Sequence, residues 1–206
     1  MRHKTTLLAV AAAIVLGTTG AGHAQLPPGV FPGERDFKLA RAGAYSVDPT
    51  HTAVIAKVSH IGYARSVFRF DKVAGSLTWD PAKPAASSLK VTVDTASIST
   101  PVPGFGPELA GDGYLKSAAF PQASFVSTRF RRIDAVHGQV DGQFTLMGKT
   151  VPLTFDVSLI GAGKGFMGHP RLGIAATSAI DPRRFGLPAL LGPAIMLQID
   201  AEFAEG

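Results

Sequence analysis

Apolar and polar residues alternate with a period of two along most of the chain after residue 50. In the segment 52–60, for example, Val54 and Val58 fall on one face and Lys57 falls on the other. Successive side chains of a β-strand point to opposite faces, so this pattern predicts strands with one buried face. It predicts strands at 52–60, 66–70, 75–79, 89–94, 123–131, 136–147, 151–160, 172–181 and 194–203.

The spacing of these strands is that of successive hairpins. Turn residues separate them, as at Gly148-Lys149 and Asp80-Pro81. The 23 Gly and 15 Pro suit a protein of strands and turns, and the 13 Phe supply bulky side chains for a core or a pocket. About eight or nine strands at hairpin spacing predict an all-β antiparallel barrel or sandwich.

One long connection interrupts the alternation at 95–121. Its prolines, among them Pro101 and Pro107, exclude a regular strand, whereas 108–109 and 114–119 are compatible with short helical turns. A connection of this length inside a compact domain is uncommon unless it has a function. In a barrel, this partly helical segment would form a lid over one mouth.

The first residues have the features of a secretory signal peptide. Arg2 and Lys4 precede an uncharged apolar run at 7–17, which is too short to span a bilayer, and small residues precede Gln25. We expect cleavage after Ala24, a proline-rich extension at 25–43 with one helical turn near 35–40, and a single domain at 44–206. An exported chain without cysteine or N-glycosylation sequons fits a bacterial periplasm.

Composition excludes several functional classes. A hydrophobic content of 46% with 17% charged residues excludes a disordered chain, and the lack of cysteine excludes disulfides, thiolate zinc sites and thiol nucleophiles. The formal net charge is +5, part of which belongs to the expected signal peptide. The remaining basic residues form two short clusters, at 129–132 and 183–184, and so predict no nucleic-acid binding.

Motifs for catalysis and metal binding are weak. Residues 163–168 match G-x-G-x-x-G, but Pro170 follows within a strand pattern, which indicates a hairpin loop and not a dinucleotide site. His51 and His60 are nine positions apart and would point to opposite faces of one strand, so we expect no shared metal ion. The chain contains neither H-E-x-x-H nor the G-x-S-x-G elbow of serine hydrolases.

Phenylalanines recur within the predicted strands and next to them. Small barrels of about eight strands are either filled by such side chains or enclose one apolar ligand, and the residues alone leave both alternatives open. The cluster comprises Phe120, Phe125, Phe130, Phe144 and Phe155.

Several segments, in order and with matching spacing, resemble the YceI-like proteins. The opening motif is Tyr45-Ser46-Val47-Asp48-Pro49-Thr50-His51, followed by His60, and the central motif is Asp94-Thr95-Ala96-Ser97-Ile98-Ser99-Thr100. Further matches lie at 115–117, 125–128, 140–153 and 180–187. The resemblance spans about 45–203; the segment 25–43 lies outside it.

This resemblance implies a lipocalin-like antiparallel barrel of about eight strands and an exported lipid-binding protein without enzymatic activity. The expected ligand is a polyisoprenoid or an isoprenoid quinone held in an apolar cavity, with no cofactor or metal. Phenylalanines would contact the chain, and polar groups at a mouth would select the headgroup. The candidate ligand-binding residues are His60, Arg65, Phe70, Phe120, Phe125, Phe144, Phe155, Arg183 and Phe185.

Two alternatives belong to other classes. One is a secreted hydrolase on the same barrel that uses His60 or His51, and the other is an envelope stress or interaction module with a filled core. For the mature chain we expect no transmembrane span, and a homodimer is compatible with the sequence.

Overall fold

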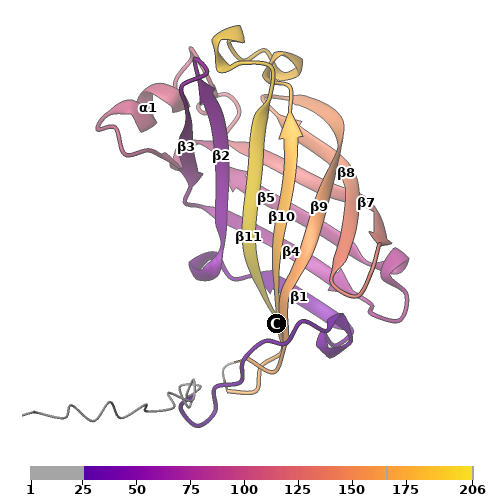
Figure 1. Ribbon diagram of the computed structural model, residues 1–206. Coiled ribbons are helices and arrows are strands. Elements are labelled where there is room, and N and C mark those ends of the chain that lie inside the picture. The colour runs from indigo at the N-terminus through magenta and orange to yellow at the C-terminus, as the bar shows by residue number, and fades with distance from the viewer. Residues whose placement is uncertain (1–25, 166, 206) are drawn as a thin grey trace, which may run out of the picture.

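The computed structural model describes residues 26–165 and 167–205, which form a twisted antiparallel β-barrel (Figure 1). The expected signal peptide at 1–24 lies outside the described residues. The strands are β1 (Gly43–Val47), β2 (Ala53–His60), β3 (Ala64–Phe70), β4 (Val73–Trp79), β5 (Ser88–Asp94), β6 (Ile98–Ser99), β7 (Gln122–Arg132), β8 (His137–Leu146), β9 (Lys149–Gly163), β10 (Arg171–Ile180) and β11 (Ile195–Glu205).

Short helical segments connect the strands. The one α-helix in the described part of the chain, α1 (Phe105–Ala110), lies in the long connection after β6. The 3₁₀ turns are η1 (Phe37–Leu39), η2 (Pro49–His51), η3 (Pro84–Ala86), η4 (Thr95–Ser97), η5 (Pro182–Phe185) and η6 (Ala189–Leu191). Among the described residues, none of these helices is long and apolar enough to cross a membrane.

Eight of the strands close into a ring. Antiparallel pairing runs in the order β1-β4-β5-β7-β8-β9-β10-β11, and β11 also pairs with β1, where Tyr45 lies opposite Glu205. A two-residue turn at Met147 and Gly148, both with positive φ (50° and 71°), joins β8 to β9. Turns of this kind match the twist of paired strands. The expected lipocalin-like barrel of about eight strands is therefore confirmed.

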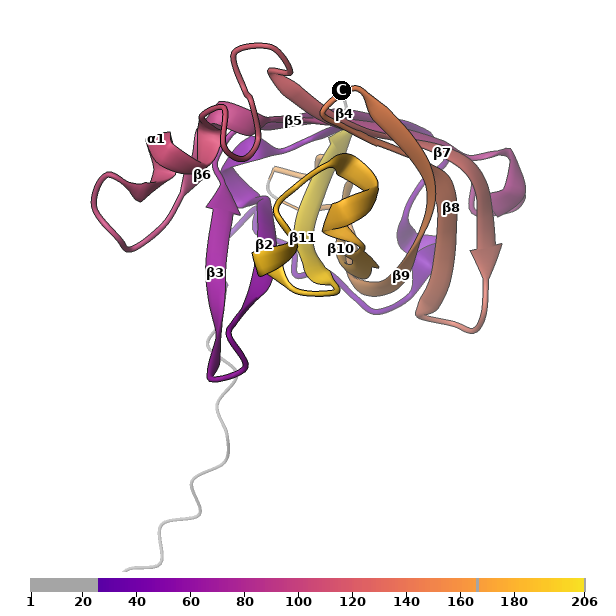
Figure 2. The ribbon, with the colours of Figure 1, turned by 90° about the horizontal axis from the view of Figure 1, so that it is seen from above.

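Beside β3, the barrel is covered by the long connection. β2 pairs with β11, β3 pairs with β2, and the short β6 pairs with the end of β3. In Figure 2, β6 lies between β3 and β5, and α1 lies on the outer side of β6. The ring of Phe105 in α1 packs against Phe68 of β3 with centres 6.2 Å apart, and Thr95 Oγ1 donates a hydrogen bond to the Phe120 carbonyl at 2.8 Å. Beyond the two-residue β6, side chains of the long connection complete the wall here.

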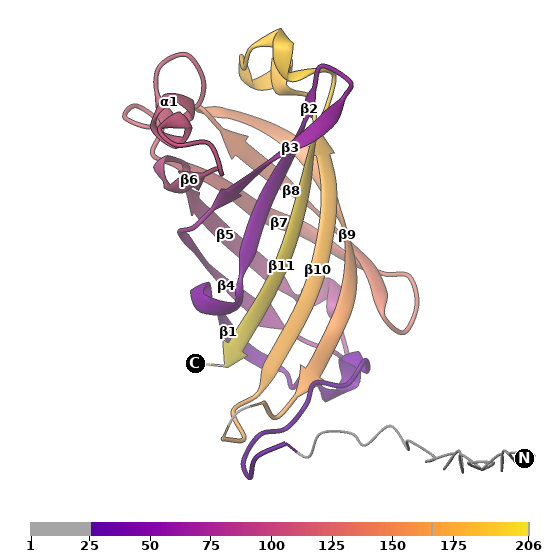
Figure 3. The ribbon, with the colours of Figure 1, turned by 60° about the vertical axis from the view of Figure 1, so that its left-hand side comes forward.

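The two ends of the barrel carry different segments. At the upper end in Figures 1 and 3 lie the β2–β3 hairpin, the β8–β9 turn and the 181–194 segment, which Figure 2 shows lying across the barrel mouth. At the lower end lie the β7–β8 and β9–β10 turns and the extension. The extension is attached to the β9–β10 hairpin, since the Glu34 and Ala162 backbones exchange hydrogen bonds.

Two groups of buried side chains form the core. The group nearer the upper end includes Phe68, Leu115 and Phe185, and the group nearer the lower end includes Tyr45 and Phe203. Both groups draw on the inward positions of the strands, where the alternation places apolar residues.

Every strand expected from alternation is present, with ends shifted by a few residues. β1 and β6 were not expected. β1 alternates over only five residues directly after the proline-rich extension, and β6 has only two residues, so both are too short for the pattern to identify a strand. The helical turn expected near 35–40 is present as η1, in which the Lys38 N–H donates a hydrogen bond to the Asp36 carboxylate.

Candidate functional site

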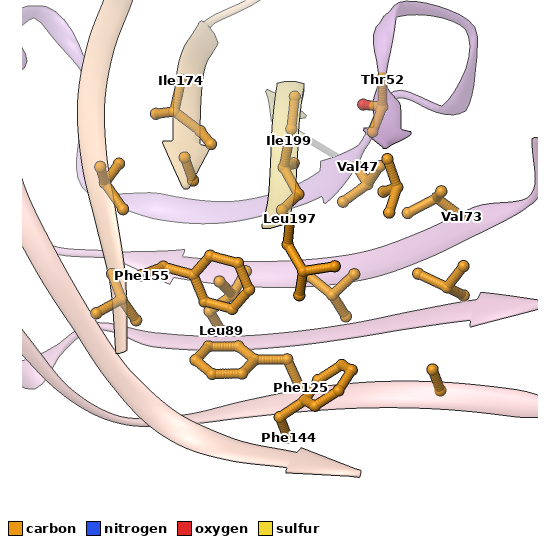
Figure 4. Close-up of a pocket in the computed structure, with 18 of the residues that line it drawn as sticks. Val47, Thr52, Val73, Leu89, Phe125, Phe144, Phe155, Ile174, Leu197 and Ile199 are labelled. Atoms are coloured by element: carbon orange, nitrogen blue, oxygen red, sulfur yellow. The ribbon is translucent and has the colours of Figure 1, made fainter. Parts of the chain in front are cut away.

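An apolar cavity of about 330 Å³ lies inside the barrel, and its wall includes residues of both core groups (Figure 4). Each strand of the closed ring contributes inward-facing side chains to the wall. Cavities of roughly 300–1,000 Å³ with apolar walls are typical of small-molecule sites. The interior is therefore not filled by its own side chains.

Three phenylalanines on neighbouring strands form one side of the cavity. Phe125 of β7, Phe144 of β8 and Phe155 of β9 point inward in Figure 4. The Phe125 and Phe155 rings meet edge to face with centres 5.0 Å apart. Phe70 of β3 also lines the cavity. The structure thus brings these four expected residues together on one apolar surface.

Two other expected phenylalanines lie outside the cavity wall. Phe185 of η5 is only 1% exposed and packs behind Phe144, with ring centres 5.5 Å apart. Phe120 lies at the end of the long connection, next to Gly148 of the β8–β9 turn. Both belong to the packing around the cavity and do not form its surface.

Aliphatic side chains make up most of the remaining wall, and we did not expect them as ligand contacts. The alternation itself identifies them, because the inward residues of one strand lie at every second position. The inward residues of β2, β5 and β11 that line the cavity are Val54, Ala56, Val58, Leu89, Val91, Val93, Ile195, Leu197, Ile199, Ala201 and Phe203.

Polar side chains line the lower end of the cavity, where β7 meets β8. Asp134 caps this turn, and its carboxylate accepts the backbone N–H groups of Val136 and His137 at 2.8 Å. These bonds and the nearby His137 ring lower the pKa of Asp134 to about 2. The guanidinium of Arg132 lies 3.9 Å from the ring centre of Phe37, so the extension also closes this end.

Trp79, the one tryptophan of the chain, lines the cavity from the end of β4. Its ring centre lies 6.4 Å from that of Phe130. The indole Nε1 is buried and has no hydrogen-bond partner in the described part of the chain. A buried N–H without an acceptor costs about 1–3 kcal/mol, and a ligand oxygen within reach would remove that cost.

The expected polar ligand contacts lie on the outside of the upper end. His60 and Arg65 are exposed beside the β2–β3 turn. Arg183 of η5 is also exposed, and two of its nitrogens donate to the Asp181 carboxylate at 2.8 Å. This pairing lowers the pKa of Asp181 and raises that of Arg183. None of the three basic residues lines the cavity.

A polar network on the outside of the lower end ties η2 to β10 and β11. Arg171 Nη1 donates to Asp48 Oδ2 at 2.7 Å and to Glu202 Oε1 at 2.5 Å, and His51 Nδ1 lies 3.0 Å from Asp48 Oδ2. Hydrogen bonds from Thr50, His51 and Arg171 hold the pKa of Asp48 well below its usual range. The same Asp48 carboxylate raises the pKa of His51.

This network resembles neither a metal site nor a catalytic triad. Asp48, His51 and Glu202 have potential ligand atoms within 4.8 Å of one another, but Arg171 already neutralises both carboxylates. In a triad, the histidine uses different nitrogens for the acid and the nucleophile. Here Asp48 and the Thr50 hydroxyl both contact Nδ1 of His51. The arrangement is that of a structural ion-pair network.

Groups with acid–base chemistry thus lie at the ends of the barrel or outside it, and the wall between the ends is apolar. Such a wall shields an apolar chain from water and provides contact along its length. His60 and His51, the two histidines considered for catalysis, lie at opposite ends of β2 and outside the cavity.

Comparison with known sequences identifies related proteins over almost the whole chain. The family model of the YceI-like domain matches residues 45–203. A UPF0312 protein of Enterobacter sp. (strain 638) is 32% identical over 191 residues, which cover 93% of this chain and 91% of that protein. A UPF0312 protein of Pseudomonas putida (strain W619) is 34% identical over 167 residues, covering 79% of this chain and 87% of that protein.

Solved structures share the fold. BcnA of Burkholderia cenocepacia superposes with a TM-score of 0.68 at 22% identity, covering 76% of this chain and 98% of BcnA. A polyisoprenoid binding domain from Saccharophagus degradans superposes with a TM-score of 0.56 at 14% identity, covering 81% of this chain and all of that domain.

Proposed function

This chain belongs to the family of YceI-like domains, and from that premise we propose that it is an exported carrier or scavenger that holds one isoprenoid lipid in the barrel cavity. The ligand class is a polyisoprenoid or an isoprenoid quinone. Export to the periplasm follows from the expected signal peptide at 1–24. The protein binds its ligand and does not transform it.

The observation that carries the proposal is the apolar wall of the cavity. Burial of apolar surface contributes about 0.8 kcal/mol per CH₂, so a five-carbon prenyl unit contributes up to about 4 kcal/mol. Three buried units approach nanomolar affinity before the cost of association is subtracted. Phe70, Phe125, Phe144 and Phe155 would contact the chain. The structural neighbour from Saccharophagus degradans, itself described as a polyisoprenoid binding domain, supports this ligand class.

The polar headgroup belongs at the lower end in this proposal. Trp79 offers an N–H donor there, and Arg132 and His137 lie beside it in the cavity wall. A quinone carbonyl or a prenyl oxygen suits such donors. The chain would then extend toward the upper end, past the phenylalanines.

A cavity-filling variant tests the proposal. Ala176 of β10 lines the cavity and its neighbour Ala175 does not, so Ala176→Phe and Ala175→Phe place the same ring on opposite faces of one strand. We expect Ala176→Phe to lower the affinity for a fluorescent farnesyl probe at least tenfold, and Ala175→Phe to change it less than twofold. Native mass spectrometry of the purified wild-type protein should show a bound lipid. Absence of lipid together with no probe uptake would refute the proposal.

A further inference from the structure

The upper end of the barrel carries a set of large apolar side chains that face solvent. At the tip of the β2–β3 hairpin, Ile61 is 81% exposed and Tyr63 is 91% exposed, and Leu190 of η6 is 72% exposed. Val67 and Met196 lie just below, on either side of Lys57 in the register of β3, β2 and β11. The upper-end patch is defined by Ile61, Tyr63, Val67, Leu190 and Met196.

The two segments of this patch are neighbours in space. Figures 1 and 3 both show the hairpin tip and the 181–194 segment projecting side by side beyond the barrel. A β-carbon on Gly192, at the end of η6, would lie 3.8 Å from the β-carbon of Ser59 in β2. The exposed side chains therefore belong to one surface.

The backbone at Ile61 argues that this exposure has a function. Ile61 has a φ of 52° and Gly62 a φ of 83°, the conformation of a tight hairpin turn. Asn or Gly is preferred at the first of these positions, and a β-branched residue with positive φ is strained. An isoleucine at this position therefore lowers stability through backbone strain, and its exposed side chain recovers none of that cost by packing. Strain of this kind is found mostly at functional sites.

The charge around the patch indicates its partner. The segments 57–66 and 181–196 contain the basic residues Lys57, Arg65, Arg183 and Arg184 and a single carboxylate, Asp181. A second copy of this chain would bring like charges together, whereas an anionic bilayer surface attracts them. Apolar side chains that enter the headgroup region beside Lys and Arg are the usual arrangement of a membrane-surface contact.

We infer that the upper-end patch docks the barrel on the surface of an anionic bilayer, where lipid ligand is taken up or delivered. The exchange of ligand rests on the proposed function, but the docking itself does not. His60, Arg65 and Arg183, which the sequence assigned to a cavity mouth, would then contact lipid headgroups outside the cavity. Each cation near the surface contributes about fivefold to binding, and each apolar side chain about tenfold.

Sedimentation with vesicles of phosphatidylglycerol and phosphatidylcholine tests the docking. We expect Ile61→Asn and Leu190→Ser each to lower the partition coefficient about tenfold, while Ile61→Asn leaves the unfolding temperature unchanged or higher because Asn accepts the turn conformation. Arg184→Gln should lower binding to anionic vesicles only, by about fivefold. The matched control is Ile133→Asn, since Ile133 is 61% exposed in the turn at the opposite end. We expect less than a twofold change there.

The outcomes separate this proposal from the proposed function. Vesicle binding that depends on Ile61 supports docking even if no prenyl probe is bound, which would refute only the proposed function. Normal probe binding without vesicle binding refutes docking alone. Equal vesicle binding by all variants overturns the assignment of the surface. A change from dimer to monomer in light scattering of Ile61→Asn, with no effect of vesicles, would show that the patch joins two copies of the chain.

Discussion

Substitution of Gly142 provides a sharp test of the packing behind the cavity. Gly142 of β8 lies opposite Ser127, next to a bulge in β7 at 127–129. A β-carbon on Gly142 would lie 2.5 Å from the carbonyl oxygen of Val126 and 2.6 Å from Cε2 of Phe125. Both distances are well below ordinary carbon contacts, which begin near 3.5 Å. Gly142→Ala therefore requires β7 or the Phe125 ring to move.

The expected cost follows from two opposing effects. Overpacking a core site by one methyl group costs about 1–3 kcal/mol, and alanine in a strand is favoured over glycine by about 0.5–1 kcal/mol. The net loss in the free energy of unfolding is about 1–2 kcal/mol. For a domain of this size, each kcal/mol lowers the unfolding temperature by about 2–4 °C. A ring of Phe125 displaced toward Phe155 would also occupy the cavity, so the affinity for a prenyl probe should fall as well.

Thermal unfolding followed by circular dichroism measures this effect. The control is Gly113→Ala, because no heavy atom lies within 4 Å of a β-carbon at Gly113; its stability should be unchanged or raised by up to about 1 kcal/mol. In a double-mutant cycle, Phe125→Leu should relieve at least about 0.5 kcal/mol of the penalty at Gly142. If Gly142→Ala unfolds at or above the wild-type temperature, the close packing described here is wrong.

Three further predictions concern other parts of the barrel. Ser117→Ala should leave the unfolding temperature unchanged or higher, because the buried Ser117 Oγ has no hydrogen-bond partner among the described residues and its burial is uncompensated; a clear loss of stability would reveal a bond to this hydroxyl. The pKa of Asp48 is lowered by hydrogen bonds from Thr50 and, among others, Arg171. A carboxyl group of this kind stabilises the fold above its unfolded pKa of about 3.9, and this stability is lost as the pH falls through the lower folded value. The unfolding temperature should therefore decline below about pH 4, and Asp48→Asn should reduce that decline in melting curves from pH 2 to 7. Phe37→Ala removes an aromatic ring from the lower end of the cavity and should speed the release of a prenyl probe several-fold in stopped-flow measurements, whereas an unchanged rate would show that this end does not control release.

The strands and their buried faces were predictable from sequence. Alternation assigned Val54 and Val58 to one face of β2 and Lys57 to the other, and the structure places the valines in the cavity wall. The period of a strand is a local property, so it can be read without knowledge of the partner strands. Phe125 and Phe155, which lie on regular strands, also line the cavity, and their role as ligand contacts stays a prediction.

Residues on turns could not be placed by this reasoning. Phe120 and Phe185 lie on connections, where successive side chains do not alternate between two faces. Neither residue lines the cavity. The contact of Phe37 with Arg132 joins segments far apart in the chain and depends on where the β7–β8 turn ends. Whether Arg65 faces a cavity or solvent likewise depends on how the hairpin projects from the barrel, which no local pattern encodes.

The covering beside β3 has a consequence for how a long ligand enters. Parting two paired strands of the ring would break a row of backbone hydrogen bonds, whereas moving α1 away mainly breaks side-chain packing such as the contact of Phe105 with Phe68. The barrel wall is therefore easiest to open on the side that α1 covers. A prenyl chain could enter the cavity through this side of the wall instead of through one end of the barrel. If so, amide hydrogens of α1 should exchange with deuterium well before those of β8 through β10.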